Sequence, residues 1–225
     1  MARTVKDPEE RRNEILDAAE ELFVTKGYEA TSIKDIIKKI DVAHGLFYYY
    51  FSSKEDVLNS IVIRYWDTIS KRLSEIACDE NKGPVEKIEE MFLEGVLMKK
   101  ERMDILSNVL RTDNPLFMNK IIRYGIDMFV PILVVPVKEG IRQGIFHVDY
   151  PEYVLEMHFI GSSYSFDVHS LREGFDQYKI KLILMFDMLE RMLGAKDGTF
   201  NNIKSIMGSM VDEIIEKYYS DFLNK

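Results

Sequence analysis

Residues 32–54, SIKDIIKKIDVAHGLFYYYFSSK, constrain the fold more than any other stretch of the chain. Four isoleucines in its first half recur at the i, i+3, i+4, i+7 spacing that places side chains on one face of a helix. They are Ile33, Ile36, Ile37 and Ile40. Asp41 then interrupts the pattern, and aspartate tolerates the left-handed backbone conformation that a tight turn between helices needs. The stretch therefore predicts two short helices joined by a tight turn.

The second of these helices is predicted to begin near His44 and to be rich in aromatic residues. Phe47, Tyr50 and Phe51 recur at helical spacing, so we expect them to anchor the helix inward. The side chains left to face away are His44, Leu46, Tyr48 and Tyr49. A helix-turn-helix that exposes its second helix is the arrangement with which many proteins enter the major groove of DNA.

The net charge of −8 argues against binding to nucleic acid, but the distribution of the charges along the chain weakens this argument. An acidic chain is an unusual partner for nucleic acid, because such proteins normally carry a basic surface. Here the signs are segregated: the acids of the N-terminal part lie mainly between Asp7 and Glu29, whereas residues 31–54 contain four lysines and two aspartates. A local basic surface is therefore compatible with the acidic composition.

Length and composition indicate a folded protein of one large or two small domains, because 225 residues that are 46% hydrophobic can bury a sizeable core. The longest apolar run, residues 128–137, has ten residues and contains Pro131 and Pro136, so we expect no membrane span. A single cysteine, Cys78, excludes an intrachain disulfide, and the charged N-terminus lacks a secretory core. These features favour a cytoplasmic location.

Helical periodicity without sustained strand alternation predicts an all-α fold. After a first helix near 8–26 and a long helix from Ser53, we expect helices near 84–101, 103–111, 115–142, 151–171, 174–194 and 200–221. Pro131 and Pro136 should kink or interrupt the helix at 115–142. We expect a helix-turn-helix domain at 1–54, a connecting helix at 55–78, and a larger helical domain for ligand binding and dimerisation at 79–225.

Residues 11–61 resemble the DNA-binding domain of the tetracycline-repressor (TetR) family of bacterial transcription regulators. The residues that carry the resemblance are Ile15, Leu16, Asp17, Ala18, Ala19, Leu22, Phe23, Gly27, Tyr28, Thr31, Ser32, Gly45, Tyr48, Tyr50, Phe51, Ser53, Lys54, Glu55 and Leu58. The resemblance implies a homodimer that binds palindromic operator DNA as a repressor and is released by a small apolar effector. It implies DNA contacts at Thr31 or Ser32, His44, Gly45, Tyr48, Tyr49 and Lys54. The charge and apolar character of the residues add Lys34, Ala43 and Leu46 as candidate contacts.

Three positions depart from the family pattern where the sequence of DNA is read. Ala43 replaces a common serine, His44 a common lysine, and Leu46 a common polar residue. The second helix thereby loses polar donors, which favours apolar contact with thymine methyl groups.

The C-terminal part offers candidates for an effector site and for a dimer interface. Its methionines and aromatic residues suggest an adaptable apolar pocket, although ordinary core packing explains most single methionines. The pocket candidates are Met91, Phe92, Met98, Phe117, Ile121, Tyr124 and Met128, with Arg111, Asn114 and His158 as polar anchors. The interface candidates are Gly161, Ser162, Ile183, Phe186, Leu189, Met192 and Leu193, for which intrachain core is the competing interpretation.

Other function classes find less support in the sequence. The histidines and Cys78 lack metal-ligand spacing, so we expect no metal and no cofactor. A nucleophile with a positioned base is not discernible, so we expect no enzyme. An activator, or a DNA-binding protein of the same fold without an effector, is the alternative that stays open.

Overall fold

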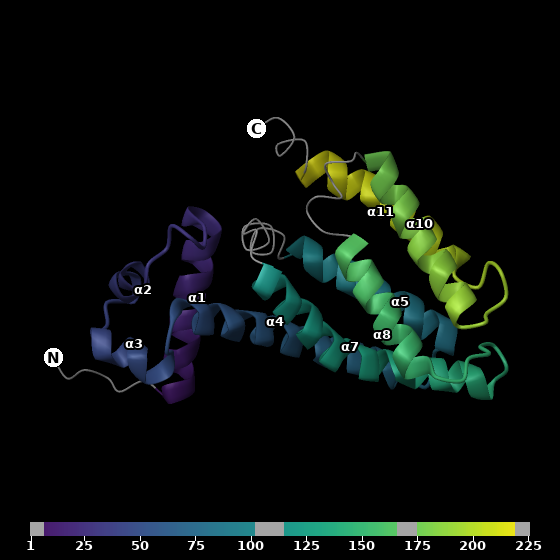
Figure 1. Cartoon of the computed structure of the whole chain (residues 1–225), viewed down its shortest axis with the longest axis horizontal. Helices are drawn as coiled ribbons and strands as arrows, with labels where there is room; N and C mark the ends of the chain where they lie inside the picture. Colours follow the sequence, from purple (N-terminus) through teal and green to yellow (C-terminus); the bar gives the residue numbers. More distant parts are fainter. Residues whose placement is uncertain (1–6, 102–114, 166–174, 219–225) are drawn as a thin grey trace. The chain divides into compact units, whose positions relative to one another are not determined.

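The computed structural model describes residues 7–101, 115–165 and 175–218. These residues form helices and connecting turns, without a strand among them, which confirms the all-α prediction (Figure 1). The helices are α1 (Pro8–Lys26), α2 (Ile33–Ile40), α3 (His44–Tyr50), α4 (Lys54–Ala77), α5 (Pro84–Glu101), α7 (Pro115–Arg142), α8 (Pro151–Ser165), α10 (Phe175–Met192) and α11 (Asn201–Tyr218). The helix expected at 103–111 lies outside the described residues.

The contacts between helices divide the chain into two compact units, with the division inside α4 between Asp67 and Thr68. Each unit has its own buried core. The N-terminal unit contains α1 to α3 and the first part of α4, and the C-terminal unit contains the rest of α4 together with α5, α7, α8, α10 and α11.

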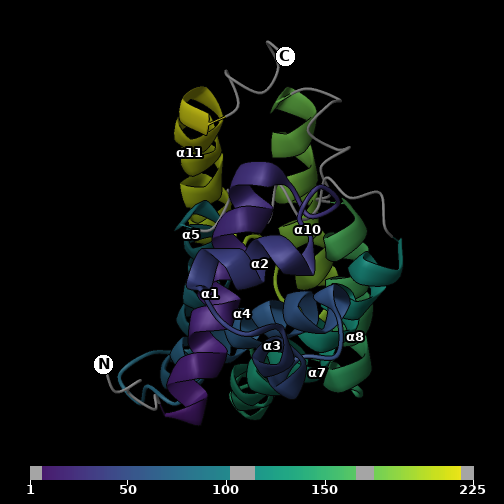
Figure 2. The same ribbon diagram turned by 90° about the vertical axis from the view of Figure 1, so that its left-hand side faces the viewer.

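Helix α1 provides the platform on which the N-terminal unit is built. The side chain of Asp7 caps it by accepting from the backbone N–H of Glu9 at 2.9 Å, and Gly27 ends it with a positive φ of 87°. The buried face carries Ile15, Leu16, Ala18, Ala19 and Phe23. Helix α2 packs against α1, and α3 packs against α2 (Figure 2).

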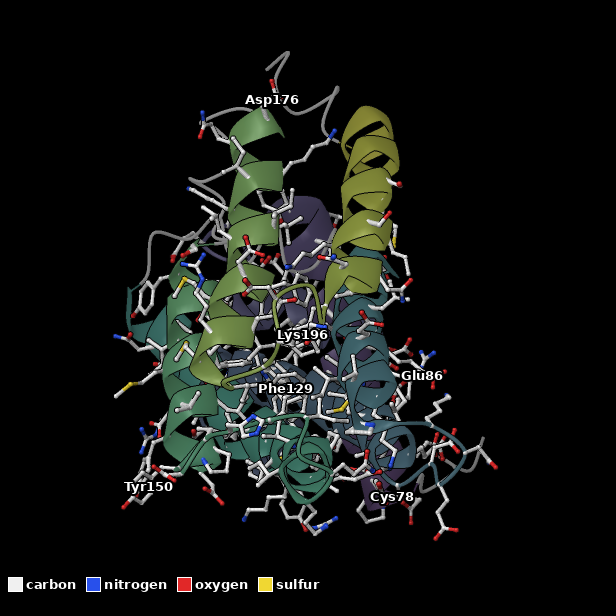
Figure 3. All side chains as sticks on the ribbon, turned by 90° about the vertical axis from the view of Figure 1, so that its right-hand side faces the viewer. Cys78, Glu86, Phe129, Tyr150, Asp176 and Lys196 are labelled. Carbon is white, nitrogen blue, oxygen red and sulfur yellow. The ribbon has the colours of Figure 1, made fainter. Side chains whose placement is uncertain are left out.

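Within the C-terminal unit, α10 and α11 run antiparallel side by side; α8 contacts α10, and α5 contacts α11 (Figures 1 and 3). Phe129 of α7 lies in the interior, whereas Tyr150 lies at the surface (Figure 3). Helix α7 runs through Pro131 and Pro136 without a break, so the prolines do not interrupt it, and a kink at either one stays a prediction. Phe129, Val130 and Val137 flank the prolines and are buried, and their burial offsets the backbone hydrogen bonds that the prolines remove.

Two buried carboxylates hold the beginning of α11. Glu190 of α10 accepts from the backbone N–H of Phe200 at 2.7 Å, and Glu89 of α5 accepts from the backbone N–H of Ile203 at 3.0 Å. Carboxylates are favourable at this end of a helix, because the first backbone N–H groups have no partner within the helix and the helix dipole is positive there. Three helices are thus tied together at one point.

The end of α7 forms a second close contact. The carbonyl of Gly140 accepts from the backbone N–H groups of Ile145 at 2.8 Å and Phe146 at 3.3 Å, so the chain folds back on the helix. The Phe146 ring is buried over Gly140 and stacks on Phe200, with 6.3 Å between the ring centroids. The absence of a side chain at Gly140 makes room for this ring.

No helix within the described ranges has the length and apolar character needed to cross a membrane. Those same ranges contain no cluster of three His, Cys, Asp or Glu side chains arranged to hold a metal ion.

Candidate DNA-binding surface

A complete capping box fixes the beginning of α2. The hydroxyl of Ser32 accepts from the backbone N–H of Asp35 at 3.2 Å, and the carboxylate of Asp35 accepts from the backbone N–H of Ser32 at 2.8 Å. Lys26 also donates to Asp35 at 2.8 Å. The hydrogen bond from Lys26, followed by those from Ser32, lowers the pKa of Asp35 below its usual range. Asp35 therefore stays a capping anion at physiological pH.

The turn between α2 and α3 depends on Asp41, as the sequence predicts. Asp41 has φ 51° and ψ 55°, the left-handed conformation, and it is the one residue other than glycine with positive φ among those described. The backbone N–H of Val42 donates to the Ile37 carbonyl at 3.3 Å. Ala43 precedes α3 with an extended backbone, and no side chain caps the helix there. The turn re-aims the chain so that α3 begins at His44.

Two phenylalanines anchor α3 to the core of the N-terminal unit. Phe47 and Phe51 are fully buried, with ring centroids 6.0 Å apart, which confirms their predicted inward orientation. The guanidinium of Arg12 lies over the Phe51 ring at 5.2 Å and donates to the Ser60 hydroxyl at 2.9 Å. Tyr50 is half-buried. Helix α3 is therefore held on one side only.

The opposite side of α3 is open. Tyr49 is 77% exposed and Tyr48 is 48% exposed. His44 and Gly45 are exposed, and Leu46 is half-buried. The His44 and Tyr48 rings lie against each other, with centroids 4.9 Å apart. The structure thus brings the predicted reading residues together on one short, rigidly anchored helix.

The predicted phosphate contacts divide into available and engaged side chains. Thr31 does not offer its hydroxyl to phosphate, contrary to the prediction, because the residue is buried. The hydroxyl donates toward the carbonyls of Gly27 at 2.7 Å and Leu22 at 3.2 Å, and these contacts close the loop after α1. Lys54 donates to the Tyr28 carbonyl at 2.8 Å and lies 4.2 Å from the centre of the Tyr28 ring. It therefore also braces this loop.

Helix α2 carries Lys34, a predicted DNA contact, and Lys38, a basic candidate that was absent from the predicted contacts. Lys34 and Lys38 are exposed, and neither has an ion pair in the part of the chain that the structure describes. Lys39, in contrast, pairs with Glu21 at 2.7 Å. The i, i+4 spacing of Lys34 and Lys38 places them on one helix face, and this spacing could have found the pair.

In the C-terminal unit, Phe92 of α5 joins several predicted and unpredicted residues. Its ring lies 5.9 Å from that of Phe129, 5.2 Å from that of Phe186 and 6.2 Å from that of His158. His158 is only 4% exposed, and burial lowers its pKa to about 4. Its Nε2 atom lies 3.5 Å from the Ser162 hydroxyl. We call His158, Phe92, Phe129 and Phe186 the aromatic cluster.

The remaining residues predicted to line a pocket differ in how deeply they are buried. Met91 is buried and Met128 half-buried, whereas Tyr124 is exposed. Arg111 and Asn114 lie outside the described residues, and so do the side chains of Met98, Phe117 and Ile121. Phe129 and Phe186 were missed as cluster members, because their helices are apolar on several faces.

Three of the predicted dimer-interface residues lie in the core of the chain and not on its surface. Phe186, Leu189 and Leu193 are fully buried within the chain, so they belong to its own core. Met192 and Ser162 are half-buried, and Gly161 is exposed. Ile183 is exposed and belongs to a different stripe of α10. The exposed apolar residues of the two neighbouring helices are Tyr153, Met157, Ile160 and Tyr164 on α8 and Ile180, Ile183, Leu184 and Met188 on α10, here called the α8/α10 stripe.

Comparison with known proteins identifies the family to which the helix-turn-helix of α2 and α3 belongs. Residues 15–61, which span α1 to the start of α4, match the family model described as bacterial regulatory proteins, tetR family. Residues 15–61 thus belong to the TetR family of DNA-binding domains. The chain is 28% identical over 93 residues to the HTH-type transcriptional repressor KstR2 of Mycobacterium tuberculosis, covering 41% of this chain and 46% of KstR2. The chain thus spans less than half the length of the curated relatives it matches.

Solved TetR-family structures resemble more of the chain. A TetR/AcrR-family regulator from Thermobifida fusca aligns with 69% of this chain and 83% of its own, at 28% identity and a TM-score of 0.54. A putative TetR-family regulator from Syntrophomonas wolfei aligns with 85% of this chain and 99% of its own, at 23% identity and a TM-score of 0.62. The second likeness is one of fold.

Proposed function

We propose that this TetR-family protein is a homodimeric transcriptional repressor that binds a palindromic operator and is released by a small apolar effector. The observation that carries the DNA-binding part is α3, a helix anchored by Phe47 and Phe51 with Tyr48 and Tyr49 exposed. We assign DNA binding to residues 1–54 and effector binding and dimerisation to residues 79–225, joined by the connecting helix at 55–78. Such a protein acts in the cytoplasm, where its operator lies.

The two subunits meet through the α8/α10 stripe in this proposal. Exposed apolar side chains recur along α8 at positions 153, 157, 160 and 164, and along α10 at 180, 184 and 188. The two helices contact each other, so their stripes are neighbours. A second copy supplies the matching surface under two-fold symmetry, giving a four-helix interface. Two copies of α3 then enter successive major grooves, about 34–36 Å apart.

The aromatic cluster is the proposed centre of the effector site. His158 is uncharged at physiological pH, and the rings of Phe92, Phe129 and Phe186 offer no counter-charge. A charged ligand group would lose its hydration there without gaining an ionic partner. A neutral, largely apolar molecule with one group that hydrogen-bonds to the His158 imidazole fits this chemistry.

Helix α4 is the proposed route from effector to operator. It is continuous from Lys54 to Ala77, and it contributes residues to both compact units. An effector that binds one arrangement of the C-terminal unit better than another shifts the population toward that arrangement. Because α4 is one helix, a displacement of its C-terminal half moves the base of the DNA-binding unit. The coupling free energy required for a useful response is about 1–3 kcal/mol.

Selection of binding sites from random DNA tests operator binding. We expect a two-fold symmetric consensus with half-sites about one helical turn apart. Tyr49→Ala should weaken binding to that consensus, whereas Tyr150→Ala, which truncates a tyrosine of similar exposure in the C-terminal unit, should not. Recovery of no consensus, or equal weakening by both variants, would contradict the proposed function.

Sedimentation tests the assembly. Met157→Lys combined with Leu184→Lys places two charges in the α8/α10 stripe and should produce a folded monomer. Val135→Lys, which charges an exposed apolar position on α7, is the control and should remain a dimer. A dimer that survives the double substitution would rule out this interface.

Thermal-shift screening with neutral aromatic and aliphatic compounds tests the effector. Hits should raise the melting temperature, weaken operator binding, and lose both effects with His158→Leu. Carboxylated analogues of the hits should be inactive. Hits that bind the variant equally well would contradict the role of His158.

A further inference from the structure

Helix α3 offers none of the side chains that read base pairs through paired hydrogen bonds. Its seven residues, HGLFYYY, include no Arg, Lys, Asn, Gln, Asp or Glu, and all seven are described by the structure. Recognition of guanine in the major groove relies mainly on Arg or Lys, adenine on Asn or Gln, and the cytosine amino group on Asp or Glu. The reading helix therefore lacks the side chains that most often select a G·C pair, and the His44 imidazole is the one nitrogen-bearing side chain on it.

Apart from the His44 imidazole and the tyrosine hydroxyls, what α3 and its N-terminal turn present is apolar. Ala43, the N-cap residue, is exposed and its methyl group makes no capping hydrogen bond. Leu46 is half-buried, and the Tyr48 and Tyr49 side chains are exposed. In the major groove the one apolar group on a base edge is the C5-methyl of thymine. The tyrosine hydroxyls can donate to phosphates, which positions the helix without reading sequence.

Gly45 gives an independent indication that the backbone of α3 approaches the DNA closely. A Cβ added to Gly45 would meet no described atom within 4 Å, so the packing of the protein does not require a glycine. Gly45 is the second residue of α3, where glycine still loses more backbone freedom on folding than alanine does. A glycine is explained here if a Cβ at this position would collide with bound DNA, because the exposed end of α3 is where we expect DNA to lie.

We propose that this protein selects A·T base pairs at the positions beneath α3, through contact of Ala43, Leu46 and the exposed tyrosine rings with thymine methyl groups. This inference rests on the proposed operator binding and adds the kind of sequence that is bound. Each half-site carries thymines on the strand that α3 faces, and Gly45 lets the helix approach them.

Replacement of thymine by deoxyuridine in the selected operator is the decisive test, because it removes the methyl and leaves base pairing unchanged. We expect A·T-rich half-sites from the selection, and an affinity loss of about fourfold for each contacted methyl. Ala43→Gly removes one apolar partner at a position where glycine is well tolerated. The variant should lose its sensitivity to deoxyuridine at one thymine and keep it at the others.

Gly45→Ala is the second measurement. It should leave thermal stability unchanged or raised, because no described atom obstructs the Cβ, and should weaken operator binding at least tenfold. Half-sites rich in G·C, or a deoxyuridine operator bound as tightly as the thymine form, would overturn the inference and leave operator binding intact. Recovery of no consensus at all would instead overturn the proposed function, and this inference with it.

Discussion

The contact between Gly140 and Phe146 allows a sharp prediction about stability. A Cβ built on Gly140 would lie 2.2 Å from Cδ2 and 2.4 Å from Cε2 of Phe146, whereas carbon atoms in favourable contact are about 3.5–4.0 Å apart. Gly140→Ala therefore forces the ring to move by more than about 1 Å. The ring cannot move freely, because it is buried against Phe200 and its backbone is bonded to Gly140.

The magnitude follows from two opposing effects. Overpacking of a filled core costs about 1–3 kcal/mol. If the phenylalanine ring left the core instead, the loss of its burial would cost a comparable amount. Replacement of glycine by alanine in a helix returns about 0.5–1 kcal/mol. We therefore expect Gly140→Ala to lower the free energy of unfolding by up to about 2.5 kcal/mol, and to be about 1–3 kcal/mol less stable than a helical Gly→Ala variant without overpacking.

Gly95→Ala in α5 is the matched control. The added Cβ would meet no described atom within 4 Å, so this variant should raise the free energy of unfolding by about 0.5–1 kcal/mol. Urea denaturation followed by far-UV circular dichroism, with equal m-values for the variants, measures both changes. If Gly140→Ala proved as stable as Gly95→Ala, the close packing of Phe146 on α7 would be refuted.

Three further predictions concern capping and burial. Ser32→Ala removes the acceptor for the Asp35 N–H and should lower stability by about 1 kcal/mol in the same denaturation experiment; an unchanged midpoint would argue against the cap. Burial lowers the pKa of His158 to about 4, so its stabilising contribution is present above the unfolded pKa of 6.5 and is lost as pH falls toward 4, by roughly 3 kcal/mol. His158→Gln should flatten that part of a stability–pH profile, and a parallel profile would contradict it. Glu190→Gln should cost about 1–3 kcal/mol through its weakened bond to the Phe200 N–H, and retention of the wild-type melting temperature would count against this cap.

Sequence periodicity predicted the helix-turn-helix because its determinants are local. The isoleucine spacing of α2, the left-handed Asp41 and the inward Phe47 each depend on residues a few positions apart. Thr31 was misassigned because a hydroxyl near a helix start can bind either phosphate or a nearby carbonyl, and only the folded loop shows that it donates toward Leu22 and Gly27.

The C-terminal unit was harder to predict, because its determinants are distant in sequence. Helix α10 has apolar residues on two faces, and the sequence could not tell that Phe186 and Leu189 face inward while Leu184 and Met188 face outward. The choice depends on where α8 and α11 pack. The contact of Glu89 with the beginning of α11 joins residues more than a hundred positions apart, and no local pattern indicates it.

The lack of lysine and arginine on α3 has a consequence for the salt dependence of binding. Counterions are released when cationic side chains neutralise phosphates, so the affinity of a DNA-binding protein falls as the salt concentration rises. Helix α3 contributes no lysine or arginine to that process, whereas Lys34 and Lys38 of α2 are exposed cations. The affinity for any DNA should thus decline with salt, while the ratio of operator to non-operator affinity stays nearly constant. Discrimination between operator and other DNA would then persist across a wide range of salt concentrations.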